Sequence, residues 1–291
     1  MYDRSTTKRY DPQCPLSNFE LDQALDHKLT FVSLSSTMLF FALFLTTSLL
    51  TLAAPLDCHN DIENSCNGTS VKAKDCADLY KSGGRISNVY SIEPRDGLGA
   101  FDVFCDQTTA GGGWTVLQKR LNGSMDFNRT WDEYKHGFGN FFTHEFWLGL
   151  DKIHRLTRNE TANRLRIELG VTNEEPLYAE YGCFGIGNES TTYRLKLSHG
   201  WGGTVKNDSF GFHNNFSFGT WDRDPAHGKC NKERGGGWWY SKNCVVSSNL
   251  NGLYPSSGTP LGNIHWDDLG STAEASAPEN TEMKIRPVDF K

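Results

Sequence analysis

Several patterns that mark common protein classes are absent from this chain of 291 residues. It has no collagen-like Gly-X-Y run, no heptad run and no repeat with a period of roughly 20–50 residues, which argues against fibrous and solenoid folds. The net charge of −6 argues against a broadly basic surface for nucleic acids. The cysteines and histidines show no zinc-binding spacing, and the motifs H-E-x-x-H, G-x-S-x-G and G-x-x-x-x-G-K-[ST] do not occur. We therefore expect neither a zinc-thiolate site nor an enzyme activity.

Glycine and aromatic side chains, by contrast, are abundant. The chain has 29 Gly, 8 Trp, 10 Tyr and 18 Phe. Glycine favours turns, and aromatic residues favour strands. This composition indicates short strands joined by loops and few long helices, in one large domain or two small ones.

An apolar run without any charged residue extends from Leu29 to Leu56. An uncharged stretch longer than ~18 residues is typical of a membrane-crossing helix. Basic residues precede the run and acidic residues follow it, a bias that places residues 1–28 in the cytoplasm, unless they are a leader, and the remainder outside. Two interpretations stay open: residues 29–56 are a signal peptide cut near Ala53 or Ala54, or a type II signal anchor that remains in the membrane.

Seven Asn-x-Ser/Thr sequons follow the apolar run and predict an exported glycoprotein. They begin at Asn67, Asn122, Asn128, Asn159, Asn188, Asn207 and Asn215. Seven of the eight cysteines also lie in the exported part, and an odd number predicts a free thiol or a bond between chains. The protein is thus expected outside the cell, secreted or anchored by a single membrane crossing.

The exported part divides into a short polar stalk at residues 57–74 and one domain at residues 75–291. A capping residue and a terminal glycine predict a helix over Asp75–Gly84, and the capping box Thr130–Glu133 predicts a helix over Trp131–His136. A third helix is expected near Leu150–Leu156. Antiparallel strands are expected at Ala100–Cys105, Gly113–Lys119, Phe146–Leu148, Leu165–Leu169, Tyr178–Phe184 and Tyr193–Leu197. Residues 200–251 should contain little regular structure, so the fold class is α+β.

A collinear series of motifs across this domain resembles the fibrinogen C-terminal domain, as found in ficolins, tachylectin-5-like lectins, microfibril-associated glycoprotein 4, angiopoietins and tenascins. The motifs are Cys76–Tyr80, Gly111–Arg120, Gly123–Phe127, Trp131–Gly139, Glu145–Gly149, Ile153–Thr157, Leu165–Leu169, Tyr178–Tyr181, Phe218–Asp224, Gly236–Tyr240, Ser248–Gly252 and Met283–Pro287. The resemblance implies a globular domain with a central antiparallel sheet, short helices and a loop-rich ligand-binding subdomain stapled by a disulfide.

The resemblance also implies specific residue roles. Cys76 would pair with Cys105, and Cys230 with Cys244. Asp222 and Asp224 would bind Ca²⁺, with the backbone carbonyls of Ala226 and Gly228 completing the shell, because hard oxygen ligands on a loop suit this ion. In acetyl-binding relatives a neighbouring pocket holds the sugar, and its counterparts here are Cys230, Trp239, Tyr240 and Val245. Val245 replaces the histidine that is usual in that pocket.

Two functions are compatible with the resemblance. The first is a Ca²⁺-supported lectin that binds glycans or glycoproteins on microbes or matrix. The alternative is a protein-binding module of the angiopoietin or tenascin kind, which acts in signalling or matrix assembly without binding sugar. In either case we expect a homo-oligomer, linked through Cys58 or Cys66 of the stalk if it is disulfide-bonded.

Overall fold

The computed structural model describes residues 72–158, 162–171, 175–197, 200–226, 230–254, 264–267, 269 and 277–291. The predicted leader or anchor and most of the predicted stalk lie outside these residues. Within the described part, no helix combines the length and the apolar character needed to cross a membrane.

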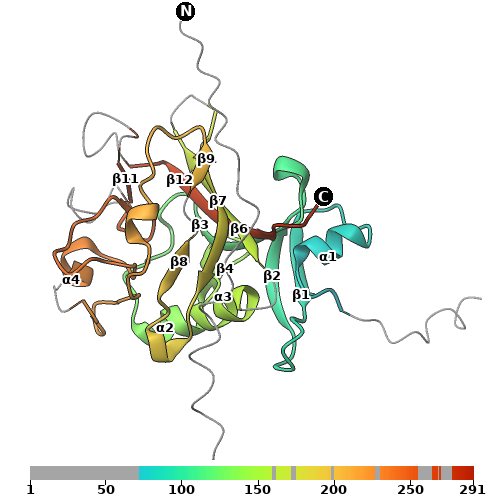
Figure 1. Ribbon diagram of the computed structural model, residues 1–291, viewed down its shortest axis with the longest axis horizontal. Coiled ribbons are helices and arrows are strands. Elements are labelled where there is room, and N and C mark those ends of the chain that lie inside the picture. Colours follow the sequence, from blue (N-terminus) through green and yellow to red (C-terminus); the bar gives the residue numbers. More distant parts are fainter. Residues whose placement is uncertain are drawn as a thin grey trace, which may run out of the picture. The chain divides into compact units, whose positions relative to one another are not determined.

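An antiparallel sheet forms the centre of the domain (Figure 1). Its main path has the order β1-β2-β3-β12-β6-β7-β8, and β4, β5 and β9 pair at its sides. The strands are β1 (Asn88–Ile92), β2 (Phe101–Asp106), β3 (Trp114–Arg120), β4 (Phe138–Asn140), β5 (Glu145–Trp147), β6 (Asn163–Gly170), β7 (Leu177–Ile186), β8 (Leu195–Leu197), β9 (Trp201–Gly203) and β12 (Asn280–Pro287). The predicted α+β class with a central antiparallel sheet is confirmed.

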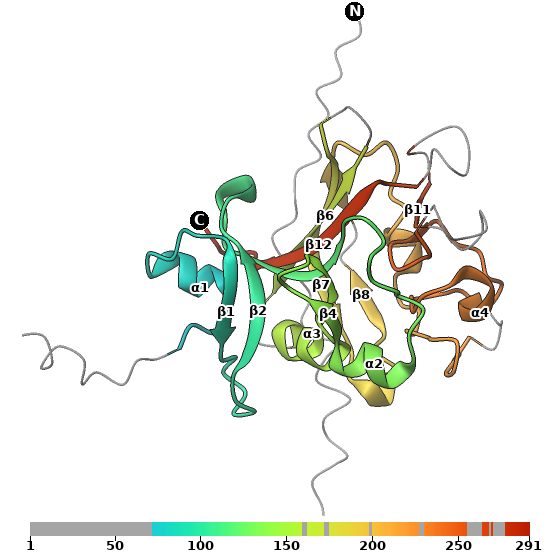
Figure 2. The same ribbon diagram turned by 180° about the vertical axis from the view of Figure 1, so that it is seen from behind.

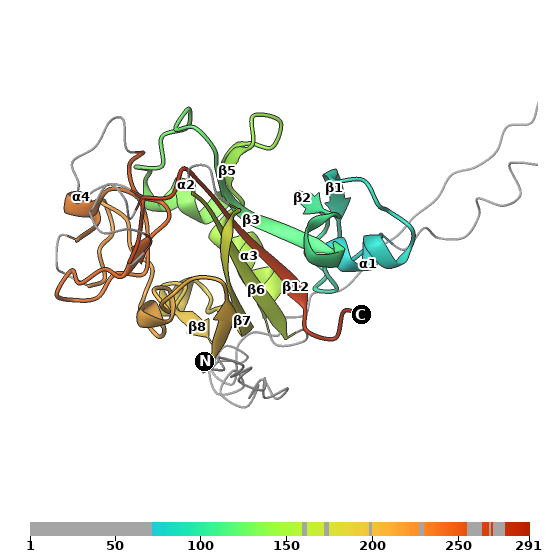
Figure 3. The same cartoon turned by 90° about the horizontal axis from the view of Figure 1, so that it is seen from above.

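The last strand of the chain, β12, occupies the middle of this sheet. It pairs with β3 on one side, where Met283 lies opposite Gln118, and with β6 on the other, where Met283 lies opposite Ile167. Figure 3 shows β12 running between these two strands. Since side chains alternate across a strand, Met283 and Ile285 enter the core, while Glu282 and Lys284 lie on the opposite face.

Three helices pack around the sheet, and two of them begin at the caps that the sequence predicted. The helix α1 (Cys76–Lys81) starts at Asp75, whose Oδ1 accepts a hydrogen bond of 2.7 Å from the backbone N–H of Asp78. The helix α2 (Trp131–His136) starts with a complete capping box. The third helix, α3 (Leu150–Thr157), contacts β7 and α2 and buries Leu150, Ile153 and Leu156.

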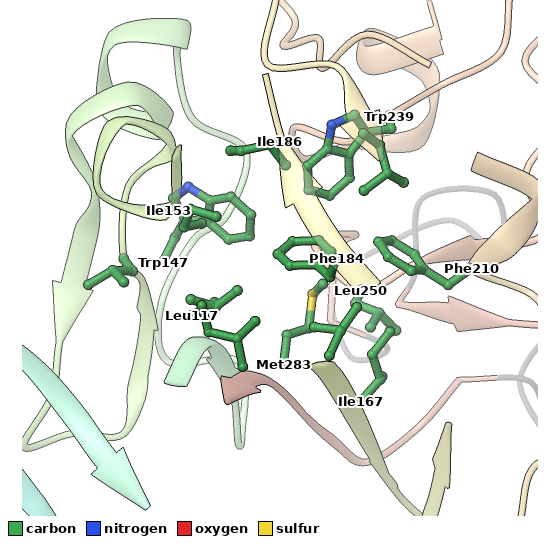
Figure 4. Close-up of a cluster of buried hydrophobic side chains, with 14 of the residues drawn as sticks. Leu117, Trp147, Ile153, Ile167, Phe184, Ile186, Phe210, Trp239, Leu250 and Met283 are labelled. Carbon is green, nitrogen blue, oxygen red and sulfur yellow. The ribbon is translucent and has the colours of Figure 1, made fainter. Parts of the chain in front are cut away.

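The core continues without a break from the sheet into the last third of the domain. Figure 4 shows side chains of the sheet and α3 meeting those of the later loops: Leu117, Trp147, Ile153, Ile167, Phe184, Ile186, Phe210, Trp239, Leu250 and Met283. All are buried. The two regions therefore share one hydrophobic core.

That last third, residues 200–226, 230–254 and 264–267, is called the loop-rich region here. It holds β9 and the short elements η6 (Gly211–His213), α4 (Cys230–Arg234), β10 (Ser248–Asn249) and β11 (His265–Trp266). In Figures 1 and 2, α4 of this region and α1 lie at opposite ends of the sheet. The expected scarcity of regular structure is confirmed in the described residues.

Both disulfides that the family resemblance implied are present. Cys76–Cys105 joins the start of α1 to β2, and Cys230–Cys244 closes a segment of the loop-rich region, with Cα–Cα distances of 5.4 and 5.2 Å. Cys183 on β7 is disulfide-bonded as well. Because the other four described cysteines pair with each other, its partner lies outside the described residues.

Candidate ligand-binding site

The two aspartates predicted to bind calcium lie on a narrow hairpin of the loop-rich region. Gly219 and Trp238 exchange two backbone hydrogen bonds of 3.0 and 3.1 Å, and Thr220 and Arg223 exchange two more of 2.8 and 3.1 Å. These bonds leave Trp221 and Asp222 at the tip. The side chain of Trp221 is 41% exposed there, which is unusual for tryptophan in this domain.

The two carboxylates of the hairpin have different surroundings. Oδ1 of Asp222 accepts hydrogen bonds from the backbone N–H of Trp131, at 2.9 Å, and from the hydroxyl of Thr220, at 2.7 Å. Oδ1 of Asp224 accepts one from the backbone N–H of Ala226, at 3.0 Å. Oδ2 of Asp224 is buried and has no hydrogen-bond partner among the residues that the structure describes. An unpaired buried carboxylate oxygen is costly, so this atom indicates a place for a cation or another donor.

The described residues contain no group of three or more His, Cys, Asp or Glu side chains placed to hold a metal. A cation at the hairpin would therefore depend on the two aspartates together with uncharged oxygens. Of the predicted carbonyl ligands, Ala226 is described, whereas Gly228 lies outside the described residues. Carboxylate and carbonyl oxygens on a loop are the donors that Ca²⁺ takes, so the residues present fit this ion.

A second polar side chain without partners lies under the same hairpin. Asn231 follows Cys230 in α4 and is buried, yet within the described part of the chain neither its Nδ2 nor its Oδ1 makes a hydrogen bond. A Cβ built on Gly219 would come within 2.7 Å of Asn231 Nδ2 and 3.0 Å of Pro225 Cδ, which places the amide beneath the hairpin. The sequence did not identify Asn231 as a site residue. The one available signal was that it directly follows Cys230, which the family resemblance placed in a disulfide.

A polar network that sequence reasoning also missed anchors the hairpin to α2. The carboxylate of Glu189 accepts hydrogen bonds from Trp131 Nε1 at 3.0 Å, Lys135 Nζ at 2.6 Å and Arg223 Nη1 at 3.1 Å. The bonds from Lys135 and Trp131 lower the pKa of Glu189 to about 2. Arg223 also stacks over the Trp131 ring, 4.0 Å from its centroid. The hairpin is thus fixed to α2 at both Asp222 and Arg223.

The aromatic residues predicted to bind a sugar are part of the core instead. Trp239 is 0% exposed and donates through Nε1 to the carbonyl of Tyr193 at 2.8 Å. Tyr240 is 3% exposed, and its hydroxyl donates to the carbonyl of Gly235 at 3.0 Å. Neither ring offers a face to a ligand, because their own polar groups are used to hold nearby loops. This corrects the expectation of an aromatic platform at these two residues.

The remaining predicted pocket residues differ in their access to solvent. Cys230 is buried in its disulfide, whereas Val245 is 53% exposed. The Ser241 hydroxyl accepts a hydrogen bond from the backbone N–H of Val245 and donates one to its carbonyl, each at 3.1 Å. The accessible part of the predicted site is therefore apolar at Val245, where an acetyl-binding relative would present an imidazole.

The sequons can be examined at five of their seven asparagines. Asn122, Asn128, Asn188, Asn207 and Asn215 are all exposed, while Asn67 and Asn159 lie outside the described residues. Exposure is the condition that glycosylation needs, so modification at these five positions stays a prediction compatible with the fold.

Comparison with protein families identifies the domain. The family model of the C-terminal globular domain of fibrinogen beta and gamma chains matches residues 72–288. The protein belongs to this family. The sequence resemblance to fibrinogen-related proteins is confirmed.

Curated relatives of this fibrinogen-related protein represent several branches of the family. Angiopoietin-related protein 7 of Homo sapiens is 45% identical over 224 residues, covering 75% of this chain and 62% of that protein. Fibroleukin of Homo sapiens and ryncolin-4 of Cerberus rynchops are each 40% identical over 235 residues, covering 75% and 79% of this chain. The match spans 52% of fibroleukin and 64% of ryncolin-4. The present sequence therefore shares less than two thirds of the length of these relatives.

Solved structures agree with the family assignment. The fibrinogen-like globe domain of human ANGPTL2 matches with a TM-score of 0.67 and 34% identity, covering 74% of this chain and 99% of that domain. Lamprey fibrin D-dimer, solved with the peptide Gly-His-Arg-Pro-amide, matches with a TM-score of 0.67 and 32% identity, covering 79% and 81%.

Proposed function

We propose that this protein is an extracellular protein-binding module of the fibrinogen-related family, and that the hairpin at Trp221 and Asp222 is part of its ligand surface. The observation that carries the proposal is the reversal of the expected aromatic pattern. Trp239 and Tyr240 are buried in the core, while Trp221 at the hairpin tip is exposed. An exposed tryptophan on a fixed loop is typical of the anchor residues of protein interfaces.

The surface around this anchor has the composition of a protein interface. Arg223 lies two residues after Trp221. Its side chain is about half exposed, and its ion pair with Glu189 fixes its orientation. Val245, joined to α4 through the neighbouring Cys244–Cys230 bridge, adds an exposed apolar group. Aromatic and arginine side chains are enriched at interface hot spots. The relatives also support protein or peptide binding. Angiopoietin-related proteins are among the similar proteins, and the lamprey structure holds a peptide.

Calcium would act in this function as a clamp on the hairpin. Asp222 and Asp224 would bind the ion together with the carbonyl of Ala226, and their two negative charges would balance its two positive charges. The ion would also contact Asp224 Oδ2, which has no hydrogen-bond partner among the described residues. The side-chain amide of Asn231 lies beneath the same hairpin, and its oxygen is one more hard ligand of the kind that Ca²⁺ takes. These residues would fix the orientation of Trp221.

A lectin function is the second candidate, and one observation favours it. The pair Asp222 and Asp224 is retained in the form that lectins of this family use, and ryncolin-4 is among the similar proteins. The exposed Val245 and the buried Trp239 and Tyr240 argue against a sugar that needs an aromatic face. Protein binding is therefore the better supported of the two.

A paired binding experiment distinguishes these functions. The full-length protein, produced in a secretory system, is tested on an array of extracellular receptor ectodomains and on a glycan array, each with and without a chelator. We expect a protein ligand whose binding falls at least tenfold in Trp221→Ala and survives enzymatic deglycosylation of the ligand. The exposed Phe142→Ala serves as the matched control and should bind normally. Binding to acetylated glycans alone, abolished by chelator, would establish the lectin instead.

The calcium site has its own test. A ligand that binds only the folded state stabilises it by about 2.7 kcal/mol at a hundred times its Kd. We expect Ca²⁺ to raise the Tm of the wild-type protein and to leave the double variant Asp222→Ala, Asp224→Ala unchanged. The variant Asp102→Ala removes an exposed carboxylate from β2, outside the loop-rich region, and should keep the full rise. A wild-type Tm that is insensitive to millimolar Ca²⁺ would contradict the site.

The cellular location is part of the proposal. Two intramolecular disulfides and five exposed sequon asparagines suit an oxidising compartment outside the cell. Whether residues 29–56 are cleaved or retained, and whether Cys58 or Cys66 links chains into a homo-oligomer, stay predictions. Mass spectrometry of the mature N-terminus and non-reducing peptide mapping test them directly.

A further inference from the structure

A cavity of about 140 Å³ is lined by residues next to α1, on the β1–β2 connection, at the end of α3 and in β12, and by none of the loop-rich region. Its floor includes the buried side chains of Leu156 and Ile285. Its charged lining consists of four basic and two acidic residues: Lys74, Arg95, Arg155, Arg158, Asp75 and Asp96. An excess of basic residues is notable because the whole protein has a net charge of −6.

Both acidic residues of the cavity are already engaged by the protein. Asp96 receives two hydrogen bonds from Arg155, Nε to Oδ2 at 2.7 Å and Nη2 to Oδ1 at 2.9 Å, and a third from the backbone N–H of Leu98 at 3.0 Å. Asp75 caps α1 through the backbone N–H of Asp78. Their negative charge is therefore directed at the protein's own donors.

Two of the basic residues keep donors available to a ligand. Arg158 Nη2 lies 3.5 Å from Asp96 Oδ2, and the guanidinium of Arg158 donates no hydrogen bond of good geometry to the described residues. Arg95 is exposed on the β1–β2 connection and forms no hydrogen bond or ion pair with the described part of the protein. These two guanidinium groups therefore keep N–H donors available to a ligand.

The inner part of the cavity is held rigid. Besides its fork to Asp96, Arg155 donates through Nη2 to the carbonyl of Gly99 at 2.6 Å and packs against the ring of Phe101, 4.8 Å from its centroid. The neighbouring backbone is fixed by a hydrogen bond of 2.9 Å from the N–H of Glu93 to the carbonyl of Ala73. A binding site whose charged groups are held in advance loses little entropy when a ligand arrives.

We propose that this cavity binds a tetrahedral oxyanion, a sulfate or phosphate ester group, between Arg158, Arg95 and Lys74. Guanidinium groups match the oxygens of such anions with paired N–H donors, and several cations around one anion offset its charge. A space of this size holds one tetrahedral oxyanion and few waters, since a water occupies about 30 Å³ in the liquid. The anion would come from a sulfated extracellular polysaccharide or from free inorganic anion.

The experiment uses the full-length secreted protein in the presence of chelator, which separates this site from the calcium hairpin. Three probes are compared by surface plasmon resonance and by NMR titration: a sulfated heparin-type oligosaccharide, its desulfated counterpart and inorganic sulfate. Arg158→Gln and Arg95→Gln remove the available cations but leave the Arg155–Asp96 pair intact. Arg194→Gln is the matched control, because it removes an exposed guanidinium from β7–β8 at another place on the domain. Unchanged Tm values verify that each variant folds.

We expect the sulfated oligosaccharide to bind, the desulfated one to fail, and each cavity variant to weaken binding about tenfold, the loss of one charge-assisted hydrogen bond. Amide signals of residues 75–77 and 95–98 should shift on titration. Inorganic sulfate that binds with the same dependence on Arg158, when the oligosaccharide does not, identifies free anion as the source. If Arg194→Gln weakens binding as much as the cavity variants do, or if no anion shifts those signals, the proposal is overturned.

Discussion

In the central sheet, backbone groups find their partners in neighbouring strands, whereas in the loop-rich region many find them in buried side chains. The strand β6 is paired along its length with β12 and β7. In the loop-rich region, Asn251 Nδ2 donates to the carbonyl of Gly237 at 2.9 Å, and Gln118 Nε2 donates to that of Leu250 at 2.8 Å. In a buried loop, each backbone N–H and C=O needs its own hydrogen-bond partner. Each side chain that supplies such a partner therefore contributes to the free energy of unfolding.

The two regions also bury charge differently. On the sheet, Lys284 is 1% exposed and lies 2.7 Å from Asp106 and from Glu168 and 3.1 Å from Glu282. In the loop-rich region, a fully buried titratable group near neutral pH is the uncharged imidazole of His213. His213 Nδ1 bonds to the carbonyl of Trp239 at 2.8 Å, and Nε2 accepts the N–H of Ser248 at 3.1 Å. The sheet relies on paired ions, and the loop-rich region on a group that must stay uncharged.

The largest effect is expected at the buried ion cluster of the sheet. Lys284→Met leaves three carboxylates, Asp106, Glu168 and Glu282, close together without their shared cation, and should cost about 3–5 kcal/mol of unfolding free energy. Urea unfolding measures the loss. Lys119→Met, which removes one partly exposed partner of Glu282, is the control and should cost less than about 1 kcal/mol. Equal losses in both variants would show that the buried ion pairs contribute no more to stability than the partly exposed one.

The disulfides allow a direct comparison of the regions. Loop entropy predicts a cost of about 3 kcal/mol for replacing either bridge by serines. The local loss of protection should differ between the two variants. Cys105 stays in β2, and the N–H of Cys76 in α1 still donates to Thr115 Oγ1 of β3 at 3.3 Å, whereas the described residues 230–250 have little regular structure. Hydrogen exchange should rise locally around α4 in Cys230→Ser, Cys244→Ser and stay low near α1 in Cys76→Ser, Cys105→Ser. The reverse pattern would show that the loop-rich region is held by other contacts.

The loop-rich region should also be the more sensitive to acid. Burial lowers the pKa of His213 to about 4 from its ordinary value of 6.5. The unfolded chain therefore takes up this proton first, and stability present above pH 6.5 is lost as the pH falls towards 4, by about 2 kcal/mol at pH 5.

Unfolding free energies at pH 7.5 and 5 measure this loss. His213→Gln should flatten the pH dependence over this range, whereas the exposed His136→Gln should keep it. A wild-type slope that His213→Gln leaves unchanged would assign the acid sensitivity to other groups.

The smallest effect is expected at the cap of α2, which connects the two regions. Thr130→Ala removes the capping box and should cost about 1 kcal/mol in thermal unfolding. Since the N–H of Trp131 in the same turn donates to Asp222, the variant should also weaken the Tm rise caused by Ca²⁺. Thr143→Ala, in an exposed turn, is the control and should change neither quantity.

Local signals in the sequence were sufficient for much of the fold. The cap at Asp75 and the capping box at Thr130 are contained in a few consecutive residues, and both helices start where they predicted. The strand β12 was recognised only as a family motif, because Glu282 and Lys284 resemble surface charges until distant residues such as Asp106 are placed beside them. Secondary-structure propensities cannot predict this ion pair, because its partners are far apart in the sequence.

The candidate site was less predictable for the same reason. Asp222 was identified from the family resemblance, but its contact with Trp131 joins residues 91 positions apart. Trp239 and Tyr240 were assigned to a ligand surface because aromatic residues suit both a sugar platform and a core. Only the fold decides between these two uses, and here it places both rings inside.

The central position of β12 has a consequence for how the protein is made. In the described sheet, β3 and β6 are joined only through this strand, which is the last to leave the ribosome. Until β12 is synthesised, β3 and β6 each have an unpaired edge. Such edges are sites for chaperone binding and for aggregation. Loss of β12 alone would therefore leave β3 and β6 without their shared partner and prevent the sheet from closing.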